Sequence, residues 1–227
     1  MERIIKYIIV TLTFINISFS NDILNYKIKY FGIYAADCTI DIKDTLYYNQ
    51  DSKRINFSVK TKPFFDFIFP ISNIYSIILD GNNRILFFQK TTSQPKVTNS
   101  LYTVNRNGKI FYDNSDFEIL PQYYNIFSIL YMIISQSEMP NNCIIEREGL
   151  LYEALINFNE EDSIYNLNLK NKNNVDPIIE HTDIFTWALF KENYKREIFI
   201  NPDSKMLEKC VFSKGLMKIS AHLYIKN

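Results

Sequence analysis

The stretch that decides the fold is NYKIKYFGIYAADCTIDI, residues 25–42. Its apolar residues Tyr26, Ile28 and Tyr30 alternate with lysines, and an extended pattern continues beyond them. A period of two residues is typical of a strand with one buried face and one wet face. The pattern predicts a strand that bends at Gly32, where a missing side chain lets a sheet curve.

An acid and a thiol stand side by side in this stretch, at Asp37 and Cys38. Neighbours on a strand point to opposite faces, so these two side chains cannot act together on one substrate. Cys38 shares a face with Ile40 and Ile42, and that face is predicted to point inward. We therefore interpret the stretch as architecture.

The same period recurs along the chain and predicts more strands, at residues 55–60, 71–79, 84–91, 101–106, 109–112, 150–158, 164–170, 195–200, 205–212 and 216–225. Asn107-Gly108 suits a tight hairpin because both central residues need a positive φ. Pro202-Asp203 favours a type I turn between the strands that flank it. The five glycines all fall at expected bends or turns, as their conformational freedom would suggest.

One segment, residues 123–135, has apolar residues nearly all round and lies between Pro121 and Pro140. It predicts a buried helix, although so many isoleucines leave a strand as the alternative. The expected fold is mainly β, with a curved antiparallel sheet, as a half-barrel or sandwich, around one buried helix.

The N-terminus carries Arg3 and Lys6, then an apolar run at residues 7–17 and small residues up to Ser20. This order is typical of a secretory signal peptide over residues 1–20. The run is too short to cross the roughly 30 Å hydrocarbon core of a bilayer. We expect export to the periplasm or cell envelope, a single envelope β domain at residues 21–227, and no transmembrane helix in the mature chain.

Charge excludes one class of partner. Without Arg3, Lys6 and Glu2, the mature chain carries 23 basic and 24 acidic residues. Such a balance gives no basic excess to attract nucleic acid. We expect no nucleic-acid partner.

The three cysteines, Cys38, Cys143 and Cys210, lack the spacing of a zinc or redox motif. They can form at most one disulfide, and the alternative is that they are small buried apolar residues. We expect no metal and no cofactor.

Little in the chain suggests catalysis. No phosphate-binding loop, zinc-protease motif or nucleophile elbow is present. In an extended segment His181 and Asp183 would share a face, and the acid could orient the imidazole as a base. A turn after Pro177 explains the same polar cluster. A hydrolase using this pair is the less favoured alternative, and we assign no catalytic residue.

The segment KPFFDFIFP, residues 62–70, is the strongest candidate for a site. Two prolines bracket it, so it cannot be a regular central strand. Its phenylalanines either plug the open end of the curved sheet or form an apolar flap over a cavity. The opposite wall would come from the predicted helix. The candidate ligand-binding residues are Phe64, Phe65, Phe67, Phe69, Ile126, Phe127 and Leu130. A mostly apolar cleft suits a lipid or acyl chain.

Three stretches carry a resemblance to a known family: YKIKYFGI at residues 26–33, FSILY at residues 127–131, and EIFINPDSKML at residues 197–207 with Phe212 and Gly215 after it. They resemble a family of bacterial cell-envelope proteins catalogued as domain of unknown function 3108. The resemblance implies a signal-directed, curved antiparallel sheet similar to the half-open barrels of periplasmic lipoprotein carriers. It implies no catalytic residues.

These observations favour a non-enzymatic envelope protein that binds a lipid or another apolar ligand in the concave face of a curved sheet. The alternative is a structural or interaction subunit of an envelope assembly, with another envelope protein as its partner.

Overall fold

The structure is a computed structural model that describes residues 21–173 and 175–225. The predicted signal peptide, residues 1–20, lies outside the described residues.

Most of the described chain forms one sheet of fifteen strands. The strands are β1 (Asn21–Tyr30), β2 (Ile33–Tyr47), β3 (Gln50–Thr61), β4 (Ser72–Leu79), β5 (Ile85–Gln94), β6 (Val97–Arg106), β7 (Lys109–Tyr112), β8 (Glu118–Ile119), β9 (Tyr123–Tyr124), β10 (Asn142–Arg147), β11 (Leu150–Asn159), β12 (Ile164–Asn171), β13 (Lys195–Ile200), β14 (Leu207–Lys214) and β15 (Met217–Leu223). Their order across the sheet is 8-7-6-5-4-3-2-1-15-14-13-12-11-10-9. Neighbours run antiparallel, except that β9 and β10 are parallel. The pairing of β1 with β15 joins the N-terminal half of the sheet to the C-terminal half.

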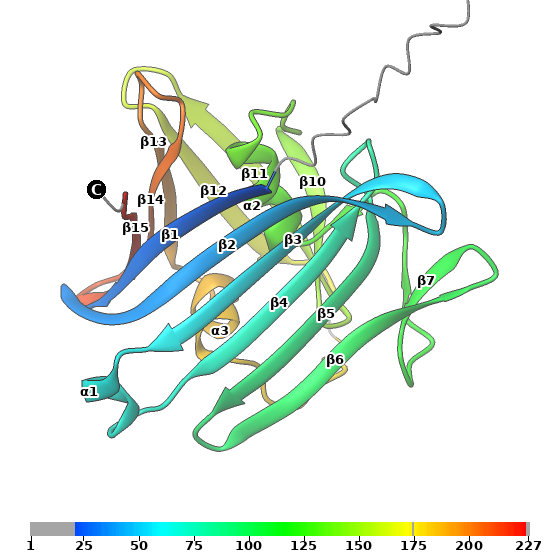
Figure 1. The fold of residues 1–227 in the computed structure, drawn as a ribbon, viewed down its shortest axis with the longest axis horizontal. Helices are drawn as coiled ribbons and strands as arrows, with labels where there is room; N and C mark the ends of the chain where they lie inside the picture. The colour runs from blue at the N-terminus through cyan, green and yellow to red at the C-terminus, as the bar shows by residue number, and fades with distance from the viewer. Residues whose placement is uncertain (1–20, 174, 226–227) are drawn as a thin grey trace, which may run out of the picture.

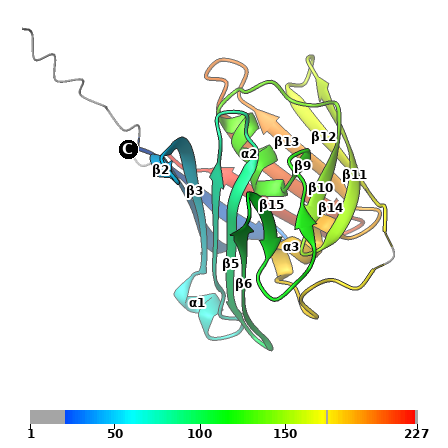
Figure 2. The same ribbon diagram turned by 90° about the vertical axis from the view of Figure 1, so that its right-hand side faces the viewer.

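The sheet curves into a nearly closed barrel whose two edges are β8 and β9 (Figures 1 and 2). Two helices, α2 (Ile126–Ile134) and α3 (Ile184–Phe190), lie on its concave side, while the four-residue α1 (Pro63–Asp66) projects from one end. The predicted mainly β fold with a curved antiparallel sheet is confirmed. The predicted buried helix is present as α2, and α3 is a second inner helix that was not predicted.

The stretch that opened the sequence analysis is a hairpin and not one bent strand. Phe31 and Gly32 have φ of 49° and 81° and connect β1 to β2. A two-residue turn with positive φ at both positions matches the twist of antiparallel strands, and glycine fits the second position without strain. The predicted inner face of β2 is confirmed, because Ile40 and Ile42 are both buried.

The other turns lie where the sequence predicted them, but the one at Pro202-Asp203 is longer than the predicted type I turn, because the Lys205 N–H donates to the Asn201 carbonyl at 2.8 Å, four residues back. Asn107 and Gly108 have positive φ and connect β6 to β7. The closing hairpin, β13 to β14, turns through Pro202 and Asp203. There the Asn201 side chain accepts hydrogen bonds from the backbone N–H groups of Asp203 and Ser204, at 3.1 and 2.8 Å.

Helix α2 is shorter than predicted because a capping box fixes its start. The Asn125 side chain accepts a hydrogen bond from the Ser128 N–H at 2.8 Å, and Ser128 Oγ accepts one from the Asn125 N–H at 3.0 Å. These bonds satisfy amide donors that have no partner inside a helix. Tyr123 and Tyr124, which the prediction placed in the helix, instead pair with β10 as strand β9.

Helix α3 was not predicted. Asp183 caps its start by accepting hydrogen bonds from the N–H groups of Phe185 and Thr186 at 2.9 and 3.0 Å. Arg196 holds its far end by donating to the carbonyl oxygens of Leu189 and, at 2.6 Å, Lys191. The helix is thereby fixed across one end of the barrel. No helix of the described residues is both long and apolar enough to cross a membrane.

Candidate functional site: an apolar cavity inside the barrel

A cavity of about 130 Å³ lies between the concave face of the sheet and the two inner helices. Its walls come from the inward positions of β1 to β4, β14 and β15, and from α2 and α3. The lining residues are Tyr26, Ile28, Cys38, Ile40, Phe57, Val59, Tyr75, Ile126, Phe127, Leu130, Phe185, Thr186, Leu189, Leu207, Cys210, Phe212 and Ala221. None of them carries a charged side chain.

Helix α2 presents Phe127 and Leu130 to this cavity. Both are only half-buried although they lie inside the barrel, because the cavity leaves them uncovered. The Phe127 ring stacks on Tyr75 with a centroid distance of 4.6 Å and lies 4.9 Å from Phe57. Such aromatic pairs stabilise packing by about 0.5–1.5 kcal/mol beyond the buried area. Phe127 is thus the aromatic centre of the wall.

Two hydroxyl groups of the lining residues already have hydrogen-bond partners in the protein. The Tyr26 hydroxyl donates to the Leu207 carbonyl at 2.9 Å, and the Thr186 hydroxyl donates to Asp183 at 2.6 Å. Burial raises the pKa of the Cys38 thiol to about 12, with the Asp37 carboxylate adding to the effect. Burial, assisted by Cys38, likewise raises the pKa of Cys210 to about 12. The thiols therefore stay protonated, and the cavity offers an apolar surface without a nucleophile or a charge.

Three of the candidate ligand-binding residues, Ile126, Phe127 and Leu130, are brought together at this cavity. The four phenylalanines of residues 62–70 do not line it. Phe64 is 74% exposed and Phe67 is 94% exposed. Phe65 is half-buried and Phe69 is 36% exposed, and neither of them faces the cavity opposite the helix as the sequence suggested.

The proline bracket explains the position of these phenylalanines. Pro63 starts α1, and the chain re-enters the sheet only at β4, so the segment extends past the end of the barrel (Figure 1). Thr61 and Ile71 close the base of this loop, with the Thr61 N–H donating to the Ile71 carbonyl at 3.1 Å. The rings of Phe64 and Phe67 therefore lie beyond the last ladder hydrogen bonds and face solvent.

His181 and Asp183 are not assembled as a pair. The His181 side chain is 65% exposed and its ring lies 3.6 Å from the Glu180 carboxylate. Asp183 is fully buried and binds Lys90 at 2.8 Å. The hydrolase interpretation expected both on one face of an extended segment, whereas the start of α3 at Ile184 turns the acid inward to cap the helix.

A buried cluster of charges joins the two halves of the sheet. Lys90, on β5, binds Glu148, Asp183 and the Thr182 hydroxyl, the last two at 2.8 Å. Glu148 belongs to the turn between β10 and β11, so the contact joins strands from the two ends of the sheet order. Burial would raise the pKa of Asp183, but Lys90 and the Thr186 donors outweigh it and hold that pKa below its ordinary value. We call Lys90, Glu148 and Asp183 the seam cluster.

A second contact crosses the same gap. The Tyr112 hydroxyl, on β7, lies 2.8 Å from both carboxylate oxygens of Glu146 on β10. The Gly149 N–H also donates to Glu146, at 2.9 Å. Burial raises the pKa of Glu146 from 4.5 to about 7, although these donors lower it. The raised value makes this carboxyl sensitive to pH near neutrality.

We expect Glu146→Gln to remove a pH dependence from the stability. The folded state holds this proton more tightly than the unfolded chain, so its contribution is complete below about pH 4.5 and is lost as the pH rises to about 7. The wild type should therefore lose about 3 kcal/mol relative to the variant between acid and alkaline pH. Urea unfolding of both proteins at a series of pH values measures this difference. Parallel curves for the two proteins would contradict it.

The three cysteines are free, and no disulfide is present in the described part of the chain. Within residues 21–173 and 175–225, no group of three or more His, Cys, Asp or Glu side chains could hold a metal ion. The seam cluster consists of ion pairs from Lys90 to the two buried carboxylates.

Comparisons with known proteins give a structural likeness but no family. No family model matches the chain, and no curated protein matches it. A solved structure described as a beta-barrel-like protein of domain of unknown function DUF1849 from Brucella abortus is similar over 90% of this chain and 95% of that one, at 6% identity and a TM-score of 0.47. The resemblance to domain of unknown function 3108 stays a prediction.

Proposed function

We propose that the protein binds an apolar ligand in the cavity and catalyses no reaction. The observation that supports this proposal is the uncharged wall around a void of about 130 Å³ between the sheet and the inner helices. Engineered apolar cavities of roughly 150 Å³ stay dry and admit benzene. The void is therefore large enough for a benzene-sized apolar group or the end of an acyl chain.

The helices suit the cavity to such a ligand. Phe127 and Leu130 on α2 and Leu189 on α3 face the sheet across it. A long acyl chain would need more space, because ligand sites usually measure about 300–1,000 Å³. The terminal methyl end would lie in the cavity, with the rest of the chain passing between helix and sheet.

The sequence adds the place of action to this proposal. The signal peptide at residues 1–20 would export the chain to the periplasm or cell envelope, where acyl chains are abundant. We therefore propose an envelope carrier or scaffold for an apolar ligand, with a lipid as its first candidate. A purely structural subunit is the competing class, and it would hold no ligand.

Filling the cavity tests the proposal. We expect Ala221→Met to place a longer side chain in the void and lower the affinity for toluene and for decanoate at least about tenfold, which corresponds to about 1.4 kcal/mol. Isothermal titration of the mature chain with each probe measures this. Overpacking a filled core typically lowers the free energy of unfolding by about 1–3 kcal/mol. Because the void takes up the added atoms, the loss for Ala221→Met should be smaller than this.

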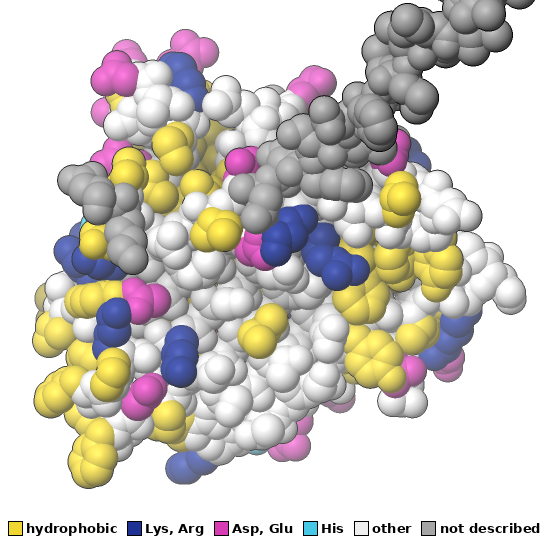
Figure 3. Space-filling model, in the orientation of Figure 1, with side chains coloured by type: hydrophobic (Ala, Val, Ile, Leu, Met, Phe, Trp, Pro, Cys, Tyr) yellow, Lys and Arg dark blue, Asp and Glu magenta, His cyan; other side chains and the backbone are white. Residues whose placement is uncertain are grey.

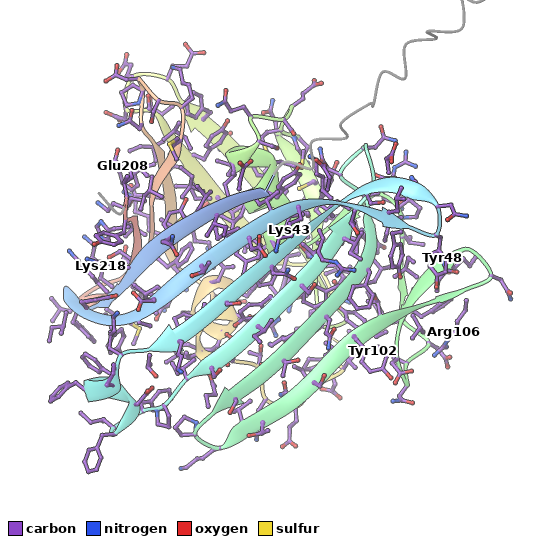
Figure 4. The ribbon with its side chains drawn as sticks, in the orientation of Figure 1. Lys43, Tyr48, Tyr102, Arg106, Glu208 and Lys218 are labelled. Carbon is purple, nitrogen blue, oxygen red and sulfur yellow. The ribbon has the colours of Figure 1, made fainter. Side chains whose placement is uncertain are left out.

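Glu208→Met is the matched control, since it adds the same side chain at an exposed position of the neighbouring strand β14, at the periphery of the molecule (Figure 4). It should leave both affinities unchanged. If neither probe binds the wild type, or if Ala221→Met binds them as tightly, the cavity is only a packing defect and the proposal is wrong.

A further inference from the structure

One end of the barrel carries a set of large apolar side chains that face solvent. Its members, which we call the apolar rim, are Phe31, Ile33, Phe64, Phe67, Ile68 and Leu216, each at least 52% exposed. Phe67 and Leu216 are 94% and 92% exposed, so almost nothing in the chain covers them. Isolated exposed apolar residues are ordinary, but a contiguous set marks a surface that meets another apolar phase.

The rim is contiguous because hydrogen bonds hold its three segments together. The Phe31 N–H, in the β1–β2 turn, donates to the Lys218 carbonyl of β15 at 3.0 Å. The Lys62 N–H, at the start of the α1 loop, donates to the Ala35 carbonyl of β2 at 2.9 Å. Figure 1 shows the two turns and α1 along one edge, and Figure 3 shows hydrophobic side chains gathered there.

The charges around the rim are mostly positive. Residues 29–33, 60–71 and 214–218 contain five lysines and one acid, Asp66, in a chain whose formal net charge is zero. The Asp66 carboxylate accepts a hydrogen bond from the Thr61 hydroxyl, and Lys62 forms an ion pair with Asp37. Lys214 and Lys218 are exposed and form no ion pair within the described residues.

We propose that the apolar rim docks the protein on a bilayer surface that contains anionic lipid. Aromatic and aliphatic tips enter the boundary between headgroups and acyl chains, while flanking lysines pair with anionic headgroups. The positive sign of the flanking charges selects this partner over an uncharged apolar surface. The proposal deepens the proposed function, since the same end of the barrel is closed by α3, whose Phe185 and Leu189 line the cavity.

Vesicle sedimentation of the mature chain tests the docking. We expect the wild type to bind vesicles of phosphatidylcholine with about a third phosphatidylglycerol, and to bind far less to phosphatidylcholine alone or at high salt. The double variant Phe67→Ser with Leu216→Ser should lower the partition coefficient on anionic vesicles at least about tenfold. Lys214→Glu with Lys218→Glu should lower it by a similar factor.

Leu46→Ser with Tyr48→Ser is the matched control. These residues are 64% and 77% exposed but lie at the opposite end of the barrel, where Figure 4 marks Tyr48 far from Lys218. This variant should partition as the wild type does. Equal partition of the rim variant and the wild type, no binding of the wild type to either vesicle, or binding of the rim only to another protein would overturn the proposal.

The two proposals fail separately. Ala221→Met should bind vesicles as the wild type does while losing toluene, and the rim variants should bind dissolved toluene normally while losing vesicles. If toluene does not bind the wild type, the apolar ligand is rejected and the docking result still stands.

Discussion

Replacement of Lys90 by methionine should lower the free energy of unfolding by about 3–5 kcal/mol. The lysine side chain is 1% exposed and binds two carboxylates, Asp183 and Glu148, that are 0% and 3% exposed. Methionine fills the same space but leaves Asp183 buried without its cation, and leaves Glu148 with only Arg147, whose Nε lies 3.6 Å from that carboxylate. The loss of stability at this contact between β5 and the β10–β11 turn should therefore be larger than the loss from removing an exposed ion pair. Equilibrium urea unfolding monitored by circular dichroism measures the loss.

Two controls make this expectation specific. Lys53→Met removes a comparable ion pair, with Asp44, but there the lysine side chain is 37% exposed, so the loss should stay below about 1 kcal/mol. Adding Glu148→Gln to Lys90→Met should recover part of the stability, because one of the two buried acids becomes neutral. Equal losses for Lys90→Met and Lys53→Met would show that the seam cluster does not hold the barrel closed.

Phe127→Ala should also lower the free energy of unfolding by about 3–5 kcal/mol. The ring contacts Tyr75, Phe57 and Phe88, with centroid distances of 4.6, 4.9 and 6.0 Å. Its removal also joins a new void to the cavity. We therefore expect the variant to bind decanoate more tightly than the wild type does, although it unfolds more easily.

Phe67→Ala is the control for this change. It removes the same ring from a position that is 94% exposed, so stability should change by no more than about 0.5 kcal/mol. Thermal and urea unfolding of both variants, followed by titration with decanoate, give the comparison. A small loss at Phe127 together with weaker decanoate binding would contradict the assignment of this ring to the cavity wall.

Much of the fold could be predicted because its signals are local. Alternation in Tyr26, Ile28 and the residues around Cys38 sets the faces of β1 and β2, and Asn107-Gly108 specifies its turn directly. The hairpin at Phe31-Gly32 was missed because a phenylalanine with φ of 49° gives no warning in the sequence. Asparagine usually occupies the first central position of such a turn, whereas this chain has phenylalanine there.

Helix α3 could not be predicted because its seven residues, IFTWALF, form a short, nearly continuous apolar run, which periodicity alone cannot assign to a helix or a strand. Its main local signal is Asp183, an N-cap residue two positions after the histidine that suggested a catalytic pair. Tertiary contacts decide the matter, since Lys90 binds that acid from a strand far away in the sequence.

The candidate site was predicted in part, for a physical reason that separates its two halves. Ile126, Phe127 and Leu130 belong to a capped helix whose apolar surface must be buried, so their inward position followed from the pattern. The phenylalanines around Asp66 were expected to contact the interior because they are apolar. They lie outside because the loop between Pro63 and Pro70 extends beyond the sheet, which composition alone does not reveal.

The most direct test of the apolar-ligand proposal is native mass spectrometry of the protein, purified without detergent, beside Ala221→Met prepared in the same way. The account predicts that the wild type carries an added mass, identified after release as a lipid or fatty acid, and that the variant carries much less of it. If the wild type, purified from cells rich in such lipids, shows only the mass of the polypeptide, the account is contradicted.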